Sequence, residues 1–204
     1  MESNPSDPNL TFLDRLEALG RSLPDERAGS VPDGTPAAVL APLVLPDWRS
    51  SKKDAKLLFI KRSEQLTKHA GQMAFPGGTV ENDDPDFLSA GFREGFEEVG
   101  LQREQSKVLA TLPQASTPSG FSLHPYFVAT TQQRFVSQPE EVQSIHLIEV
   151  EELLNCPVRV EQRVWSERSY RVIYFDTSSA CIWGVTGRIT EILLSHFFNW
   201  KAPS

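Results

Sequence analysis

The chain has 204 residues, of which 39% are hydrophobic and 23% charged, a composition typical of a soluble protein with one buried core. Its formal net charge of −7 argues against nucleic-acid binding, because a surface that contacts many phosphates is normally basic. No apolar run is long enough to span a membrane, and the first segment, MESNPSDPNL, has neither the basic nor the apolar region of an export signal. We therefore expect a cytoplasmic protein of one domain, with neither a nucleic acid nor a membrane as partner.

The amino-terminal part predicts a polar segment followed by an amphipathic helix. We interpret residues 1–9 as a disordered lead and residues 10–204 as the folded domain. In TFLDRLEALGRSLP, apolar residues recur at helical spacing behind a capping pattern made by Thr11 and Asp14. The apolar stripe of this helix is suited either to covering a sheet or to joining a partner. A homodimer is therefore one of two alternatives.

The next part of the chain alternates between strand and helix patterns. A loop rich in turn-forming residues follows the first helix, and QMAFPGG predicts a short strand that runs into a turn at Gly77 and Gly78. A last helix is predicted over roughly residues 184–200. Further strands are predicted at AAVLAPLVL, KLLFIKR, KVLATL, SLHPYFVAT and SIHLIEV, with a hairpin made of VEQRVWSE and SYRVIYFD. This order predicts a single mixed α/β domain.

Cysteine usage agrees with that interpretation. Cys156 and Cys181 have no metal-ligand spacing and form no CxxC motif. We predict two reduced, buried thiols rather than a disulfide.

The segment PGGTVENDDPDFLSAGFREGFEEVGL predicts a helix that begins near Pro85 and ends at Gly100. Asp84 is the expected N-cap, since a carboxylate there accepts hydrogen bonds from free backbone N–H groups. The helix contains Gly91 and Gly95, which either admit a ligand or backbone at close range or simply relieve packing.

Three carboxylates, those of Glu94, Glu97 and Glu98, fall in the last two turns of this helix, where negative charge is disfavoured by up to about 1 kcal/mol. In projection Glu94 and Glu98 lie about 40° apart and Glu97 about 60° to the other side, so all three share one face. Such a run is usually a solvated surface, partly relieved here by Arg93. The alternative is a divalent cation that neutralises the acids, and oxygen donors of this kind suit Mg²⁺ or Mn²⁺.

These residues resemble a known signature. Gly78, the acid Asp84, and the run Arg93-Glu94-x-x-Glu97-Glu98-x-Gly100-Leu101 are similar to the Nudix box of hydrolases that act on nucleoside diphosphates linked to another moiety. The resemblance implies an α/β/α sandwich with a mixed sheet, in which the box forms a metal-holding loop-helix-loop. This copy has aspartate in place of glutamate at Asp84, and eight residues rather than seven separate it from Arg93.

The longer spacing and the upstream run LLFIKRSEQLTKHAGQMAFPGG resemble the coenzyme A pyrophosphatase branch of that family. The segments STPSGFSLHPYF, QPEEV and IWGVTGRI are similar to further segments of the branch, although Gly187 replaces an alanine. The branch implies hydrolysis of coenzyme A or its derivatives to adenosine 3′,5′-bisphosphate and 4′-phosphopantetheine. Other nucleoside diphosphate derivatives (ADP-ribose, a nucleotide sugar, a damaged nucleotide) and a non-catalytic nucleotide-sensing module are the alternatives.

The resemblance also implies roles for individual residues. Glu94 and Glu98 would ligate Mg²⁺ or Mn²⁺, with help from Glu97 and the backbone at Gly78, and Arg93 would orient the carboxylates by ion pairing. The general base would be Glu98 or Glu141, with Glu140 less favoured than Glu141. A plain solvated turn is an equally weighted explanation of the acids at Glu140 and Glu141.

Substrate contacts are predicted on both sides of the box. Arg62, Lys68 and His69 could meet substrate phosphates, although Lys68 could also be simply exposed and His69 could be structural. Gly77 would bring its backbone close to the ligand. Phe121 is a candidate wall for a nucleobase or pantetheine arm, although aromatic residues in strands more often belong to the core.

Overall fold

The computed structural model describes residues 10–23, 34–67, 69–165 and 168–203. The predicted disordered lead at residues 1–9, most of the following turn-rich loop and Lys68 lie outside the described residues.

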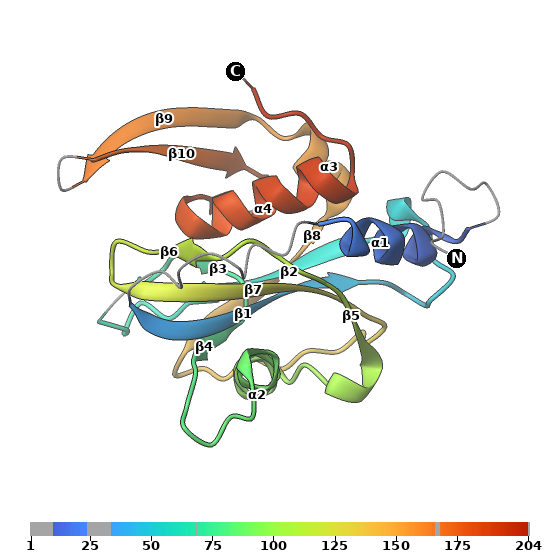
Figure 1. Cartoon of the computed structure of the whole chain (residues 1–204), viewed down its shortest axis with the longest axis horizontal. Helices are drawn as coiled ribbons and strands as arrows, with labels where there is room; N and C mark the ends of the chain where they lie inside the picture. The colour runs from blue at the N-terminus through green and yellow to red at the C-terminus, as the bar shows by residue number, and fades with distance from the viewer. Residues whose placement is uncertain (1–9, 24–33, 68, 166–167, 204) are drawn as a thin grey trace.

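A mixed sheet forms the centre of the described molecule (Figure 1). Its main path runs in the order β3-β2-β1-β7-β5, and β4, β8 and β6 pair with β1, β2 and β7, respectively. Strands β1 and β7 run parallel along their whole length, whereas the other pairs are antiparallel. The strands are β1 (Thr35–Val44), β2 (Lys56–Arg62), β3 (Met73–Ala74), β4 (Gly77–Thr79), β5 (Ser106–Thr111), β6 (Ala115–Ser116), β7 (Phe121–Thr130) and β8 (Val142–Glu149).

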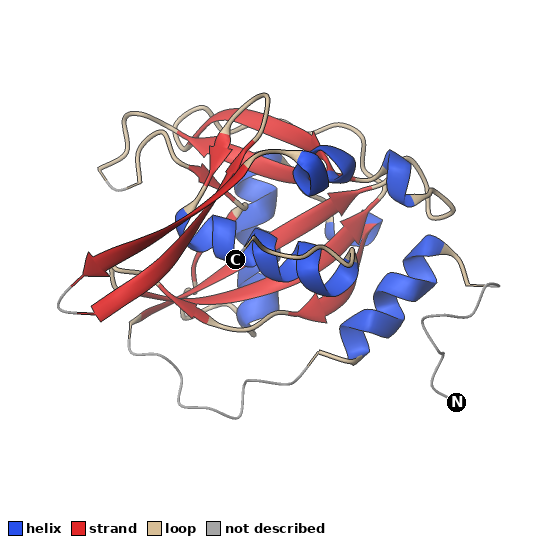
Figure 2. Ribbon diagram, turned by 90° about the horizontal axis from the view of Figure 1, so that it is seen from above, coloured by secondary structure: helices blue, strands red, loops and turns tan. Residues whose placement is uncertain are grey.

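Helices cover both faces of this sheet (Figures 1 and 2). Helix α2 (Phe87–Val99) lies on one face, and α1 (Phe12–Arg21) and α4 (Gly184–Phe197) lie on the other. The remaining helices are α3 (Val150–Asn155) and the short 3₁₀ turns η2 (Lys52–Asp54) and η3 (Arg103–Gln105). The arrangement confirms the predicted α/β/α sandwich in a single domain.

A smaller sheet lies outside α4. The predicted hairpin forms β9 (Val158–Trp165) and β10 (Arg168–Asp176), and β11 (Cys181–Ile182) pairs with β10. Figure 1 shows this hairpin extending beyond α4 on the side away from the central sheet.

Strand β1 is a nearly continuous apolar run that forms a central strand of the sheet. Successive side chains of a strand point to opposite faces, so a strand covered on both sides needs apolar residues at most positions. Leu40 packs into the core beneath α2, whereas Leu43 packs into the core beneath α1 and α4.

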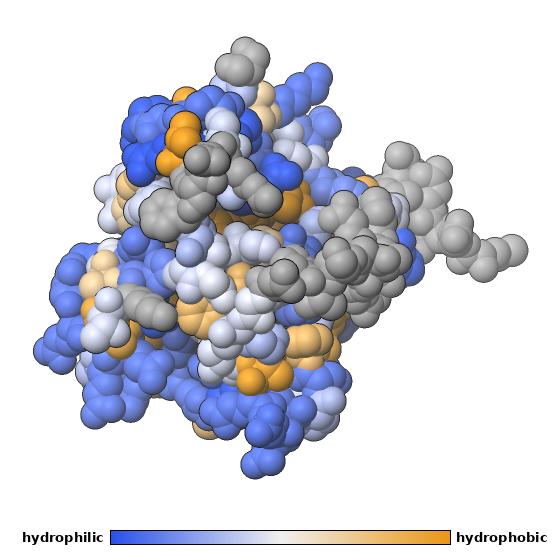
Figure 3. Space-filling model, turned by 60° about the vertical axis from the view of Figure 1, so that its left-hand side comes forward, coloured by the Kyte–Doolittle hydropathy of each residue, from blue (hydrophilic) through white to orange (hydrophobic). Residues whose placement is uncertain are grey.

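On the face shown in Figure 3, apolar surface is concentrated in a central zone, with hydrophilic regions above and below.

The ends of the helices agree with the sequence in part. Thr11 and Asp14 form the predicted capping box of α1. The prediction for the start of α2 was wrong, because Asp86 is the N-cap and its Oδ1 accepts the Ser89 N–H at 2.7 Å. Asp84 instead forms an ion pair with Arg93.

Two further boundaries differ from the prediction. Helix α4 ends at Phe197 rather than near residue 200, because Asn199 adopts a left-handed conformation with φ 56°. The predicted turn at Gly77 and Gly78 is a short strand, β4, paired with β1.

Two smaller predictions can be compared with the described residues. Gly91 and Gly95 both face Leu40 of β1, which supports the packing explanation for these glycines. The two cysteines are free, as predicted, but only Cys156 is partly buried and Cys181 is exposed, because β11 is a short strand at the edge of the small sheet. Within the described ranges, no helix is both long and apolar enough to cross a membrane.

Candidate active site

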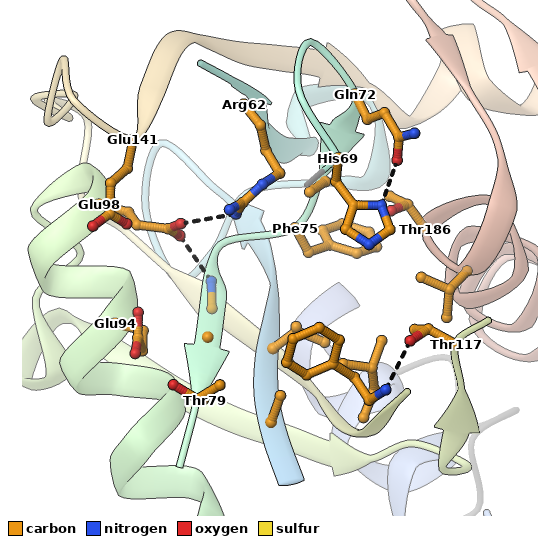
Figure 4. A pocket seen from close by; sticks show the side chains of 18 of the residues that line it. Arg62, His69, Gln72, Phe75, Thr79, Glu94, Glu98, Thr117, Glu141 and Thr186 are labelled. Carbon is orange, nitrogen blue, oxygen red and sulfur yellow. Dashed lines mark hydrogen bonds and ion pairs between the residues drawn. The ribbon is translucent and has the colours of Figure 1, made fainter. Parts of the chain in front are cut away.

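A cavity of about 440 Å³ lies between the carboxyl-terminal half of α2, the strands β2 and β4, and the amino terminus of α4. One end is lined by charged side chains, and Figure 4 shows Arg62, Glu94, Glu98 and Glu141 on that side. The other end is formed largely by uncharged and apolar residues, including Leu66, Phe75, Phe121, Leu123, Val185 and Ile189. The cavity therefore offers a charged end and an apolar end to one ligand.

Glu98 is the most enclosed of the acids. Its side chain is 2% exposed, its Oε1 lies 3.6 Å from Arg62 Nη1, and its Oε2 accepts the Gly77 N–H at 2.8 Å. Burial raises the pKa of Glu98 to about 8, and the nearby carboxylates of Glu94 and Glu141 add to the rise. The Gly77 hydrogen bond and Arg62 oppose this rise only in part.

Glu94 lies beside the backbone of β4. Its side chain is 15% exposed, and burial raises its pKa although Arg93 opposes the rise. A β-carbon at Gly78 would collide with the Glu94 carboxylate. The glycine at position 78 thus lets the carboxylate approach the strand, which is a requirement of close approach rather than of a turn.

Arg93 connects the acids of the box from outside the cavity. Its Nη1 donates to Glu94 Oε1 at 3.1 Å and to Glu97 Oε2 at 3.2 Å. Its Nη2 donates to the Thr79 carbonyl at 3.0 Å, which fixes the guanidinium against β4. This geometry suits the predicted orienting role of Arg93.

Glu97 lies at the edge of the site. Its side chain is 56% exposed and does not line the cavity. Of the predicted trio only Glu94 and Glu98 line the cavity. The expectation that all three converge there is wrong for Glu97, whose carboxylate instead shares the Arg93 Nη1 donor with Glu94 outside the cavity. The third carboxylate at the cavity is that of Glu141.

Glu141 reaches the site from the loop before β8. Its backbone carbonyl accepts the Ser63 N–H at 2.8 Å, and the next residue, Val142, pairs with Arg62 across β2 and β8. These bonds hold the loop at the end of β2, beside Arg62. Glu140 is exposed and does not line the cavity.

The predicted substrate-binding residues fall on the same cavity where the structure describes them. Arg62, His69, Gly77 and Phe121 all line it, and Lys68 lies outside the described residues. Arg62 Nε is buried and has no hydrogen-bond partner among the described residues. A buried donor of this kind at a cavity wall suits an anionic ligand.

The amino terminus of α4 also belongs to the site, although none of its residues was among the predicted site residues. Val185, Thr186 and Ile189 of α4 line the cavity, and the Thr186 hydroxyl donates to the Met73 carbonyl at 3.1 Å. Val185, Thr186 and Ile189 all lie within the segment IWGVTGRI, and the family resemblance of this segment was the available signal.

The donor set fits a hard divalent cation. Burial is the main cause of the raised pKa values of Glu94 and Glu98, the Glu141 carboxylate adds to both, and the Glu94 carboxylate adds to that of Glu98. A cation among these carboxylates would offset that repulsion. In the part of the chain that the structure describes, no three His, Cys, Asp or Glu side chains are already arranged as a metal-binding set. Glu94, Glu98 and Glu141 are the carboxylates at the charged end of the cavity that would hold such an ion.

Comparisons with known proteins identify the family. A family model described as the NUDIX domain matches residues 40–170. A protein of Citrobacter koseri named "Uncharacterized Nudix hydrolase NudL" is 33% identical, covering 90% of this chain and 92% of its own. A protein of the same name from an Enterobacter species is 31% identical with the same coverage of each chain.

A crystal structure of a MutT/nudix family protein from Enterococcus faecalis has a TM-score of 0.51 and 14% identity, covering 85% of this chain and 64% of that chain. This likeness supports the fold alone. The family model and the sequence relatives lead to one conclusion: the chain belongs to the Nudix hydrolases, pyrophosphohydrolases that act on nucleoside diphosphate derivatives and generally use divalent metal ions.

Proposed function

We propose that this Nudix hydrolase splits coenzyme A or its derivatives into adenosine 3′,5′-bisphosphate and 4′-phosphopantetheine. The observation that carries the proposal is that two separate sequence resemblances meet in one cavity. Arg62, Leu66, His69, Gln72 and Phe75 come from the run that resembles the coenzyme A branch. They line the same cavity as the acids Glu94 and Glu98 of the Nudix box.

The form of the cavity supports a substrate with two unlike ends. Coenzyme A carries a diphosphate between a nucleotide and a long pantetheine arm, and this arm is less charged than the diphosphate. The charged end of the cavity suits the diphosphate, and the apolar end, with Leu66, Phe121 and Ile189, suits the arm. ADP-ribose would place a polar sugar against these apolar side chains instead.

Mg²⁺ or Mn²⁺ is the proposed cofactor, held by Glu94, Glu98 and Glu141. Such an ion, when bound, supplies positive charge that stabilises the negative charge accumulating on a diphosphate during hydrolysis. Arg93 would keep Glu94 in place through its ion pair, with Glu97 as an outer partner. Arg62 would donate to a phosphate oxygen through its unpaired Nε.

A general base is needed to take a proton from the attacking water. Glu98 and Glu141 are both candidates, since each carboxylate belongs to a residue that lines the cavity. We favour Glu141 for this role, because its side chain is exposed to water, whereas Glu98 is buried and fixed between Gly77 and Arg62.

The alternatives differ in what the purified protein turns over. We expect kcat/KM to be higher for coenzyme A than for 3′-dephospho-coenzyme A, and higher for both than for ADP-ribose. A clear preference for ADP-ribose, a nucleotide sugar or a damaged nucleotide would still support a Nudix hydrolase activity. It would exclude coenzyme A as the preferred substrate. Binding of these compounds with no turnover of any of them would favour a nucleotide-sensing module.

A further inference from the structure

His69 has an unusual backbone conformation at the wall of the cavity. Its φ angle is 57°, in the left-handed region that residues other than glycine rarely occupy. Such a conformation persists only where the surroundings hold it, and it is found often at functional sites. The contacts of the His69 side chain identify what holds it.

Both ring nitrogens of His69 are engaged. Nδ1 lies 2.9 Å from Gln72 Oε1, and Nε2 lies 2.9 Å from Ser119 Oγ, on a residue 50 positions away in the sequence. A ring with both nitrogens occupied has none left to bind a phosphate. This observation points away from direct phosphate binding by His69.

The contacts continue beyond Ser119. Ser119 Oγ lies 2.9 Å from Thr117 Oγ1, which accepts the Phe121 N–H at 3.0 Å. One donor direction satisfies the whole series when His69 is neutral: Phe121 donates to Thr117, Thr117 to Ser119, Ser119 to Nε2, and Nδ1 to Gln72. The side chain of His69 thereby connects the loop before β3 to the turn before β7.

These two segments form the walls of the cavity away from the carboxylates. The first contributes Leu66, His69 and Gln72, and the second contributes Thr117 and Phe121. In Figure 4, His69, Gln72 and Thr117 lie on the opposite side of the cavity from Glu94 and Glu98. The separation of the two segments sets the width of the cavity at its apolar end.

We propose that His69 is a positioning residue whose bond to Ser119 fixes the two segments around the part of the substrate that lies beyond the diphosphate. The identity of that part as the pantetheine arm rests on the proposed function. The connection between the two segments does not depend on it. Loss of the connection should weaken substrate binding and leave the chemical step, at the carboxylate end, nearly unchanged.

The kinetic test removes the connection from either side. His69→Ala and Ser119→Ala should each raise KM for coenzyme A about 3- to 10-fold, the effect of one lost hydrogen bond, with kcat changed less than about twofold. The effects of the two substitutions should be less than additive in the double variant, because both remove the bond between His69 and Ser119. An unchanged KM for Ser119→Ala, a loss confined to kcat, or additive effects would overturn the proposal.

Two further variants exclude simpler explanations. His69→Asn retains a residue that tolerates positive φ but is too short to reach Ser119, so it should behave like His69→Ala. His146→Ala removes a histidine whose Nε2 also lies near a serine, 2.8 Å from Ser144 Oγ, but outside the cavity lining. His146→Ala should leave KM unchanged, and a rise equal to that of His69→Ala would assign the effect to general destabilisation.

Hydrogen exchange tests the connection without any substrate. Ser119→Ala should speed amide exchange in residues 69–72, and His69→Ala should speed it in residues 117–121. Absence of both effects would overturn the connection even if coenzyme A is hydrolysed. If coenzyme A is not hydrolysed but both effects occur, the connection stands and the proposed substrate fails.

Discussion

Arg93 and Asp84 form a bidentate ion pair, with Arg93 Nε 3.1 Å from Asp84 Oδ1 and Arg93 Nη2 3.0 Å from Asp84 Oδ2. The Arg93 hydrogen bonds hold the pKa of Asp84 below its usual range, and the Glu81 N–H contributes to the same effect. Asp84, the first acid of the box, thus holds Arg93 in place, and Arg93 in turn holds Glu94. Asp84 acts on the cavity through Arg93, and four predictions follow from this and neighbouring contacts.

Asp84→Asn should lower metal affinity or kcat about 10- to 100-fold, because partners of metal-ligating carboxylates typically have effects of that size. The matched control is Glu81→Gln. Glu81 also pairs with Arg93, at 3.8 Å, but its side chain is 64% exposed, and such pairs contribute little. Metal titration and steady-state kinetics check both variants. Equal effects of the two substitutions would contradict the role given to Asp84.

Glu94→Gln and Glu98→Gln should each lower kcat about 10³-fold, corresponding to about 4 kcal/mol of activation free energy. Both carboxylates face the cavity, whereas Glu97 is exposed and outside its lining. Glu97→Gln should therefore have a much smaller effect, below about tenfold. A loss with Glu97→Gln as large as with Glu98→Gln would show that the carboxylates rearrange on metal binding to include Glu97.

Gly78→Ala should weaken metal binding about tenfold or more, because the added β-carbon would displace the Glu94 carboxylate. Gly95→Ala is the matched control within the box. A β-carbon at Gly95 would make ordinary contacts, 3.4 Å from Leu40 Cδ1 and 3.5 Å from Leu101 Cδ2. Alanine is also the better helix former, so Gly95→Ala should stabilise the fold by up to about 1 kcal/mol. Calorimetric metal titration and thermal unfolding separate the two outcomes.

Stability without metal should depend on pH through Glu98. Its pKa is about 8 in the folded protein and 4.5 as the ordinary value, so between these values the folded state retains a proton that the unfolded state has released. The free energy of unfolding should then fall as pH rises through this window, by up to about 1.4 kcal/mol per pH unit, and level off above about pH 8.

Urea unfolding in EDTA across this pH range measures the effect. Glu98→Gln, which carries no titratable group, should lack this fall. Excess Mg²⁺ should also reduce it, because the metal binds the ionised carboxylate and stabilises the folded state. Parallel pH profiles for the wild type and Glu98→Gln would contradict the burial of an ionisable Glu98.

Much of the fold could be predicted from local patterns, and the failures have physical causes. Apolar runs such as that of β1 predicted strands because both faces of the sheet are covered. The start of α2 was misplaced because Asp84 and Asp86 both suit an N-cap, and only the distant Arg93 decides between them.

The site was predictable to the extent that its residues share one helix or one motif. Helical spacing grouped Glu94 with Glu98, but spacing alone also grouped Glu97, whose exposed side chain does not line the cavity. The contact of His69 with Ser119 joins segments far apart in the chain, and nothing in either segment alone indicates it. Contacts of that kind depend on the sheet topology, which local patterns do not contain.

The most direct test of the account is mass spectrometry of the products formed from coenzyme A and Mn²⁺ by the wild-type protein and by Glu98→Gln. We predict adenosine 3′,5′-bisphosphate and 4′-phosphopantetheine from the wild type and almost none from the variant. Intact coenzyme A with both proteins, under conditions in which the wild type hydrolyses another diphosphate, would contradict the proposed substrate. Equal product from both proteins would contradict the assignment of the reaction to the buried carboxylate at the end of α2.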